Sequence, residues 1–83
     1  MYVEQLPPHD VDAEEAIIGS LLIDGSTIFR VSTNLQGEDF YRERNRWCYE
    51  ACLALRDRGD PINQISVADE LRVQNHLDDV GGP

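Results

Sequence analysis

The sequence predicts an all-α fold, a small compact bundle of about four main helices plus short helical turns. Three observations lead to this prediction. Apolar residues recur at helical spacing in four segments, capping and stop residues separate those segments, and no stretch alternates with a period of two for long enough to form a strand. The 83 residues, 41% of them hydrophobic, suffice for one domain with a small core.

The first helix is expected to follow an extended lead-in, residues 1–9, with Asp10 as its N-cap. Acidic residues near its positive end are favoured by the helix dipole: Asp12, Glu14 and Glu15. Its apolar face combines two neighbouring rows: Ala13, Ile17 and Leu21, with Ile18 and Leu22 beside them. Gly19 lies between these rows, although a mid-helix glycine costs about 0.5–1 kcal/mol relative to alanine. We interpret it as a point of close approach by a neighbouring helix backbone, with a locally weak helix as the alternative.

A second helix is expected after Asp24 and Gly25, which end the first one, and Asp24 can cap it. Its apolar positions are Ile28, Val31 and Leu35, and Gly37 is predicted to end it. The turn that follows, residues 38–41, is expected to place Phe40 in the core.

The longest helix is predicted from about Arg42 to Arg58. Its inward stripe is Asn45, Cys48, Tyr49, Cys52 and Leu55. Its outward residues are mostly Arg42, Glu43, Arg46, Glu50 and Asp57. Gly59 supplies the C-terminal stop, and Pro61 prevents the helix from resuming.

The fourth main helix is expected after a short extended link, residues 62–65. The run from Ser66 to Asp69 has the form of a capping box, so the helix is predicted to begin there and to continue to about Gln74. Its buried residues are Val67, Ala68 and Leu71. Asn75 tolerates the left-handed conformation and can close the helix, with Leu77 and Val80 packing as a tail.

The charge is strongly acidic, with 16 Asp and Glu residues, 7 basic residues that are all Arg, and a net charge of -9. Because nucleic-acid binding depends on neutralising phosphates with cations, the domain is expected not to bind DNA or RNA by itself. Its expected partner is another protein. No apolar run reaches the roughly 20 residues of a membrane span, and no basic leader or signal segment marks the start. These features predict a cytoplasmic protein.

Cys48 and Cys52 stand four residues apart on one predicted helix. They could supply half of a metal site, but a structural zinc usually has four ligands, and His9 and His76 lie in separate segments. We interpret both cysteines as small apolar side chains on a buried helix face and expect no metal site.

Several residues bear on binding. Arg58-Gly59-Asp60 spells an adhesion tripeptide, which the helix stop explains. The one basic cluster, Arg42, Arg44 and Arg46, is expected to form surface pairs such as Arg46 with Glu50, and contact with an acidic partner is the alternative. Trp47 is expected at the rim of the core, but an aromatic residue beside Arg is also typical of interface hot spots. The candidate interaction surface is therefore Tyr41, Arg42, Arg46 and Trp47.

Nothing in the sequence indicates catalysis. The phosphate-loop motif G-x-x-x-x-G-K-[ST] requires a Lys, and the chain has none. His9 has no neighbouring nucleophile, and the carboxylates are assigned to solvated faces or helix starts. We therefore expect no catalytic residue and no bound cofactor, and the pattern by itself predicts an acidic helical interaction module.

The order of motifs adds a resemblance. "LPPHDVDAEEAIIGSLLID" is similar to the opening of the N-terminal domain of DnaB-type bacterial replicative helicases. That family begins with Pro-x-(Asp/Asn)-x-x-Ala-Glu-x-x-(Leu/Ile)-Gly-(Ser/Gly)-(Leu/Met)-Leu, matched here by Pro8, Asp10, Ala13, Glu14, Ile18, Gly19, Ser20, Leu21 and Leu22. The segments "EDFYRERNRWCYEACLALRDRGDPIN" and "ISVADELRVQNHLDDVGGP" continue the match in register to the closing Gly81-Gly82. Two positions depart from the family, which often has His where Asn45 stands and Gly where Asn75 stands.

This resemblance implies a non-catalytic collar domain. It divides the chain into the lead-in, a helical head over residues 10–80, and residues 81–83 as the start of a connection. In the family a helical hairpin and an ATPase domain that uses ATP and Mg²⁺ follow. Six copies form a hexamer, a trimer of dimers, that docks primase and bears on the helicase loader. Since the hairpin makes much of the dimer contact, the head alone is expected to be monomeric or only weakly associating, with Trp47, Tyr41 and Phe29 as its exposed apolar anchors.

Two other classes of protein stay open. One is a free-standing acidic adaptor or regulator of the replication machinery that has no motor domain. The other is a small metal-binding protein that uses Cys48, Cys52 and His76.

Overall fold

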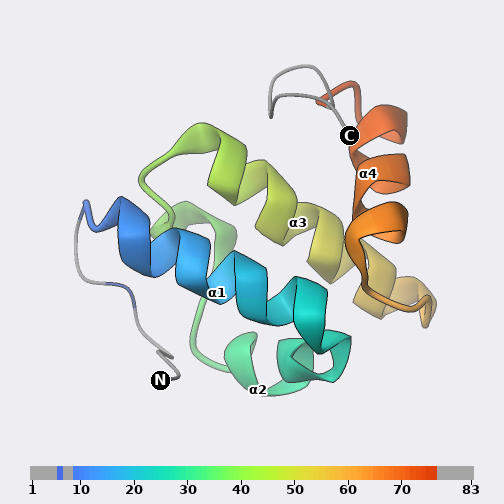
Figure 1. Cartoon of the computed structure of the whole chain (residues 1–83), viewed down its shortest axis with the longest axis horizontal. Helices are drawn as coiled ribbons and strands as arrows, with labels where there is room; N and C mark the ends of the chain where they lie inside the picture. The colour runs from blue at the N-terminus through green and yellow to red at the C-terminus, as the bar shows by residue number, and fades with distance from the viewer. Residues whose placement is uncertain (1–5, 7–8, 77–83) are drawn as a thin grey trace.

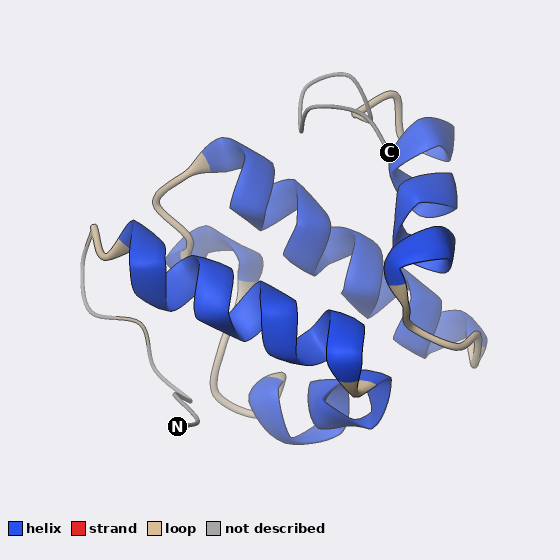
Figure 2. Cartoon of the chain, viewed as in Figure 1, coloured by secondary structure: helices blue, strands red, loops and turns tan. Residues whose placement is uncertain are grey.

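The structure is a computed structural model that describes residue 6 and residues 9–76. Its four α-helices are α1 (Val11–Ile23), α2 (Ile28–Val31), α3 (Glu43–Arg58) and α4 (Gln64–Val73). Two short 3₁₀-helices, η1 (Gly25–Thr27) and η2 (Gly37–Asp39), lie between them. The described part of the chain contains no strand, which confirms the predicted all-α class (Figures 1 and 2).

Helix α3 is the central element, because α1, α2, α4 and η2 all pack against it. Figure 1 shows α1 and α3 crossing the molecule in the same general direction, while α4 stands across the C-terminal half of α3. Tyr49 and Cys52 of α3 are fully buried. The Tyr49 ring lies 4.9 Å from that of Phe40, and its hydroxyl donates to the Leu35 carbonyl at 2.6 Å. The prediction that Phe40 enters the core is therefore confirmed.

The predicted helix ends are confirmed where the local signal is strong. The Asp10 carboxylate accepts from the Ala13 N–H at 3.0 Å, as an N-cap does. Gly59 takes the left-handed conformation with φ 75°, and the Asp60 N–H donates back to the Leu55 carbonyl. Asn75 ends α4 in the same manner with φ 63°.

The second helix is shorter than predicted. Its α-helical part ends at Val31, and Gly37 begins η2 rather than ending a helix. The cause is the polar run after Val31: the Thr33 hydroxyl donates to the Arg30 carbonyl at 2.6 Å and competes with the helical pattern. Leu35 is buried all the same, because the turn returns the chain to the core.

The predicted capping role of Ser66 is wrong by one turn. Helix α4 begins at Gln64, and Asn63 is its N-cap. The Asn63 side chain accepts from the Ser66 N–H, and the Ser66 hydroxyl accepts from the Asn63 N–H, both at 2.9 Å. A capping box exists, but Ser66 is its third helical residue.

The predicted close approach at Gly19 is also wrong. A Cβ built on Gly19 meets nothing within 4 Å. The close approach is at Gly25 instead, where a Cβ would lie 2.6 Å from the Ile62 carbonyl oxygen and 2.9 Å from Ile62 Cβ. Gly25 therefore lets η1 pack directly on the link between α3 and α4.

The buried stripe of α3 is confirmed for Asn45, Tyr49, Cys52 and Leu55, while Cys48 is half-buried at the edge. Leu71 and Val67 of α4 are buried as predicted. Some predictions concern residues outside the described part of the chain. These are the tail contacts of Leu77 and Val80, the motif residue Pro8 and the connection 81–83.

Candidate protein-interaction surface

A buried carboxylate organises the N-terminal end of α3. Glu14 is 1% exposed, and its Oε1 accepts from the Arg42 N–H at 3.2 Å and from Asn45 Nδ2 at 3.0 Å. Its Oε2 accepts from the Tyr41 N–H. The first residues of a helix have N–H groups without intrahelical partners, and the Arg42 side chain makes no capping hydrogen bond. Glu14 of α1 therefore anchors Tyr41 and the N-cap residue Arg42 immediately before α3, and its charge lies at the positive end of the α3 dipole.

The sequence prediction missed this role by assigning Glu14 to a solvated helix start. A signal was present, since Glu14 stands three, four and seven residues before the buried residues Ile17, Ile18 and Leu21. That spacing places the carboxylate on the apolar face of α1. Asn45 stands in the same position relative to the stripe of α3, so the two polar side chains meet where the stripes begin.

The Glu14 contacts hold Tyr41 and Arg42 at the surface. Tyr41 is 61% exposed, and its ring lies 4.2 Å from that of His9, a residue with φ 59°. Arg42 Nη1 lies 3.5 Å from Glu15 Oε2, and Arg44 Nη2 lies 3.7 Å from the same oxygen. Two of the three arginines of the basic cluster thus form surface pairs, which contribute little to stability.

The other two predicted surface residues face elsewhere. Arg46 is half-buried, and its Nη2 donates to the Phe40 carbonyl at 3.2 Å. The predicted pair with Glu50 does not form, since no ion pair joins Glu50 to any described residue. Trp47 packs at the rim of the core as expected, stacked on His76 with ring centres 4.2 Å apart. Of the four predicted residues, Tyr41 and Arg42 are exposed, whereas Arg46 and Trp47 are half-buried.

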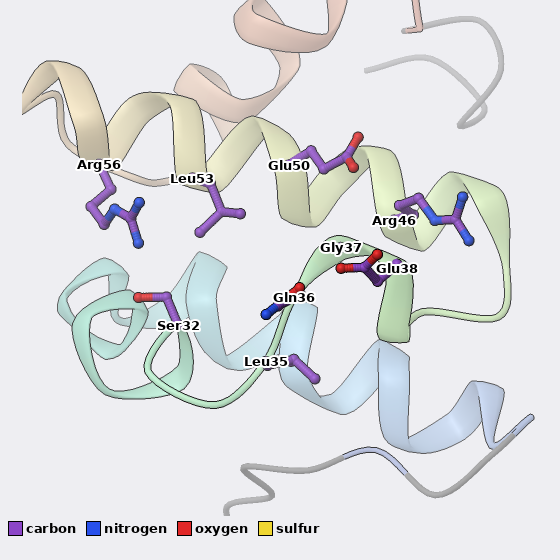
Figure 3. A pocket seen from close by; sticks show the side chains of 9 residues that line it. All are labelled: Ser32, Leu35, Gln36, Gly37, Glu38, Arg46, Glu50, Leu53 and Arg56. Atoms are coloured by element: carbon purple, nitrogen blue, oxygen red, sulfur yellow. The ribbon is translucent and has the colours of Figure 1, made fainter.

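A groove lies beside this region, between α3 and the segment from Ser32 to Glu38, with a volume of about 420 Å³. We call it the α3 groove. Leu53 and Arg56 point from α3 toward the segment that carries Ser32, and Arg46 lies at the far end (Figure 3). The lining residues are Ser32, Leu35, Gln36, Gly37, Glu38, Arg46, Glu50, Leu53 and Arg56.

Exposed apolar side chains gather on other elements. Phe29 is 67% exposed, as predicted, but Ile23, Ile65 and Val73 are more exposed still and were not predicted. A second hollow, of about 480 Å³, lies beside Phe29 against Pro61 and Ile62. Helical spacing alone does not indicate which faces neighbouring elements cover.

The ion pairs at the C-terminal end of α3 explain the adhesion-like tripeptide. Arg58 donates to Asp60 at 3.0 Å and contacts Glu70 of α4 at 2.8 Å. Hydrogen bonding to Glu70 raises the pKa of Arg58 and lowers that of the Glu70 carboxyl. Arg58-Gly59-Asp60 is thus a helix stop with an ion pair to the next helix.

The cysteines are placed as small apolar side chains. Burial raises the pKa of Cys52 to about 12, and it also raises the pKa of Cys48. Both thiols are therefore protonated at neutral pH and poor ligands or nucleophiles. Within residues 9–76, no three His, Cys, Asp or Glu side chains are arranged to hold a metal ion. None of the described helices has the length and apolar character needed to cross a membrane.

The comparisons with known proteins bear on identity. Residues 6–83 match the family described as the DnaB-like helicase N terminal domain. The chain belongs to this family. It is 37% identical over 79 residues to the replicative DNA helicase DnaC of Bacillus subtilis and 33% identical over 82 residues to the replicative DNA helicase DnaB of Geobacillus stearothermophilus. These matches cover 95% and 99% of the chain but only 17% and 18% of the relatives, so the chain spans less than a fifth of their length.

A solved DnaB domain has the same fold. The crystal structure of the N-terminal domain of DnaB helicase from Mycobacterium tuberculosis superimposes with a TM-score of 0.86 at 36% sequence identity. The match covers 93% of this chain and 54% of that one. Several residues of the DnaB-like opening motif have structural roles here: Asp10 caps α1, Glu14 anchors the N-cap residue of α3, and Ile18 and Leu21 fill the core.

Proposed function

We propose that this domain is the N-terminal head of a replicative DNA helicase, where it supports assembly of the hexamer and docks partner proteins. The observation that carries the proposal is the match of fold and sequence to a DnaB helicase N-terminal domain over 93% of the chain. Primase and the helicase loader are the proposed partners. ATP and Mg²⁺ would be used by an ATPase domain of the longer, cytoplasmic protein rather than by this head.

The chemistry of the chain supports a role in protein contacts. A net charge of -9 opposes association with phosphate backbones. The described side chains offer apolar anchors such as Phe29 and Tyr41 at the surface. Aromatic residues of this kind are frequent among the residues that dominate binding energy at interfaces.

A chimeric helicase tests the proposal. Residues 6–83 would replace the matching segment of the Bacillus subtilis relative, and the chimera would be compared with that parent protein. We expect the chimera to form hexamers in sedimentation, to unwind a forked duplex, and to respond to its primase. A chimera that unwinds DNA but neither assembles normally nor responds to primase would contradict the proposed role.

The alternative, a free-standing acidic adaptor, makes a different prediction about the gene. An ATPase domain encoded downstream of residue 83 supports the helicase head, whereas a stop codon shortly after it supports the adaptor. Fluorescence anisotropy with single-stranded DNA adds a second test. Measurable binding at micromolar protein and physiological salt would contradict the assignment to protein contacts alone.

A further inference from the structure

The charges of the α3 groove are not balanced within the domain. Glu38 and Glu50 both line the groove, and neither forms an ion pair with another described residue. Arg56, at one end, is held by Asp57, whose Oδ1 accepts from Nη2 at 2.7 Å and from Nε at 3.0 Å. Three charged side chains of the groove therefore form no ion pair with a described residue: Glu38 and Glu50, which are negative, and Arg46 at the opposite end from Arg56.

Arg46 does not neutralise these carboxylates. Its guanidinium group lies at the far end of the groove, where Nη2 donates to the Phe40 carbonyl (Figure 3). Glu50 stands one turn further along α3, yet its carboxylate lies over Gly37 instead. An alanine Cβ at position 37 would lie only 2.6 Å from Glu50 Oε2. Gly37 thus leaves the space that this carboxylate occupies.

The groove also has an apolar part. Leu53, which is only partly buried, lies between Arg56 and Glu50 (Figure 3), whereas Leu35 also lines the groove but is 2% exposed. The volume of about 420 Å³ lies within the range of roughly 300–1,000 Å³ typical of ligand pockets. The space is therefore sufficient for an apolar side chain flanked by longer cationic ones.

We propose that the α3 groove binds a basic, amphipathic segment of a partner protein, with Lys or Arg against Glu38 and Glu50 and an apolar side chain against Leu53. The proposal deepens the docking role and rests on it only for the identity of the partner as a replication protein. Complementary charge suppresses wrong partners and steers association. An acidic segment would be repelled by the Glu38 and Glu50 carboxylates and by the domain's net charge of -9. A second copy of this chain carries the same net charge, so it is disfavoured for the same reason.

The test uses the whole 83-residue chain, labelled with ¹⁵N, and a synthetic peptide. The peptide is a helix of about 14 residues with Leu on one face and Lys on the other. A matched peptide has Glu in place of Lys. The groove variant is Glu38→Gln with Glu50→Gln. The control variant is Asp12→Asn with Asp69→Asn, which removes two exposed carboxylates outside the groove. Its net charge therefore equals that of the groove variant. Circular dichroism establishes that each variant is folded.

We expect amide shifts on Lys-peptide binding to cluster at residues 32–38 and 46–56. The groove variant should weaken binding by about tenfold, whereas the control variant should change it by less than about twofold. Equal weakening in both variants, or shifts spread over every acidic face, would overturn the proposal and indicate attraction by net charge alone. Preference for the Glu peptide would also overturn it and assign binding to the arginines. These outcomes are independent of the chimera, whose assembly and unwinding do not depend on the peptide.

Discussion

The two ends of α3 are both attached to the domain through a buried glutamate, but the partners differ in kind. At the N-terminal end, Glu14 accepts from two backbone N–H groups and the Asn45 amide, all of them neutral donors. At the C-terminal end, Glu70, 6% exposed, meets the Arg58 guanidinium and the Gln74 amide. One carboxylate thus stabilises a turn of backbone, and the other pairs with a half-exposed side chain.

This difference predicts that the two ends respond differently to change. The backbone donors to Glu14 cannot move to solvent without opening the start of α3, so loss of the carboxylate leaves them partly buried and without an acceptor. Arg58 is half-exposed and can turn into water when its partner is lost. We therefore expect the N-terminal end to be the more sensitive of the two.

The largest effect is expected for Glu14→Gln. The variant places an NH₂ group against N–H donors, and it should lower the free energy of unfolding by about 3 kcal/mol. Urea unfolding followed by circular dichroism measures the loss. Asp12→Asn, a change at an exposed position two residues away on α1, is the control and should cost less than about 1 kcal/mol. Similar losses of unfolding free energy in both variants would mean that the Glu14 contacts contribute no more to stability than an exposed charge does.

Gly25→Ala should have the next largest effect. Gly25 packs against Ile62, in the link that follows the C-terminal end of α3. The new Cβ would lie 2.6 Å from the Ile62 backbone oxygen, which cannot move as a flexible side chain can. We expect a loss of about 2 kcal/mol from this overpacking. Thermal unfolding measures it, and Gly25→Ser should be at least as destabilising. Unchanged stability would show that η1 separates easily from the α3–α4 link.

The contribution of Glu70 should depend on pH. Because Arg58 lowers the pKa of Glu70 in the folded state below the ordinary value of 4.5, this contribution is fully present above that value and is lost as the pH falls through the folded pKa. Glu70→Gln should therefore lower Tm near pH 7 by about 4 °C or less. The difference from wild type should shrink as the pH falls below 4.5 and through the folded pKa. A difference that does not change with pH would exclude the ion pair as its cause.

The smallest effect, and the only gain, is expected for Gly19→Ala. The position is helical, and the added Cβ meets nothing within 4 Å. Alanine should therefore stabilise α1 by about 0.5 kcal/mol. Chemical unfolding against wild type measures this, ideally beside Gly25→Ala. A loss on Gly19→Ala would indicate that something covers this face in solution.

The helix limits that depend on neighbouring residues could be predicted from the sequence. Asp10, Gly59 and Asn75 act through hydrogen bonds within a few residues, so local pattern suffices for them. The end of α2 and the capping of α4 depended on competition between adjacent polar side chains, Thr33 in one case and Asn63 with Ser66 in the other. The sequence pattern alone does not indicate which of these polar side chains forms the hydrogen bond that ends or begins the helix.

The features that join distant segments could not be predicted in this manner. Glu14 and Tyr41 are 27 residues apart, and nothing local to either indicates the other. The same holds for Gly25 and Ile62, because nothing local to Gly25 indicates that the Ile62 backbone lies against it. For the interaction surface, the predicted exposure of Tyr41 and Phe29 is confirmed. The inward turn of Arg46 required the position of the Phe40 carbonyl.

The stack of Trp47 on His76 makes the tryptophan an intrinsic fluorescence probe of this contact. Trp47 is the one tryptophan in the sequence, so intrinsic fluorescence excited in the indole band reports on the contact between the second turn of α3 and His76, which follows α4. Emission that shifts at lower urea than the loss of helical ellipticity would register detachment of the α4 end before global unfolding. Coincident curves would instead mark the stack as part of a single cooperative unit.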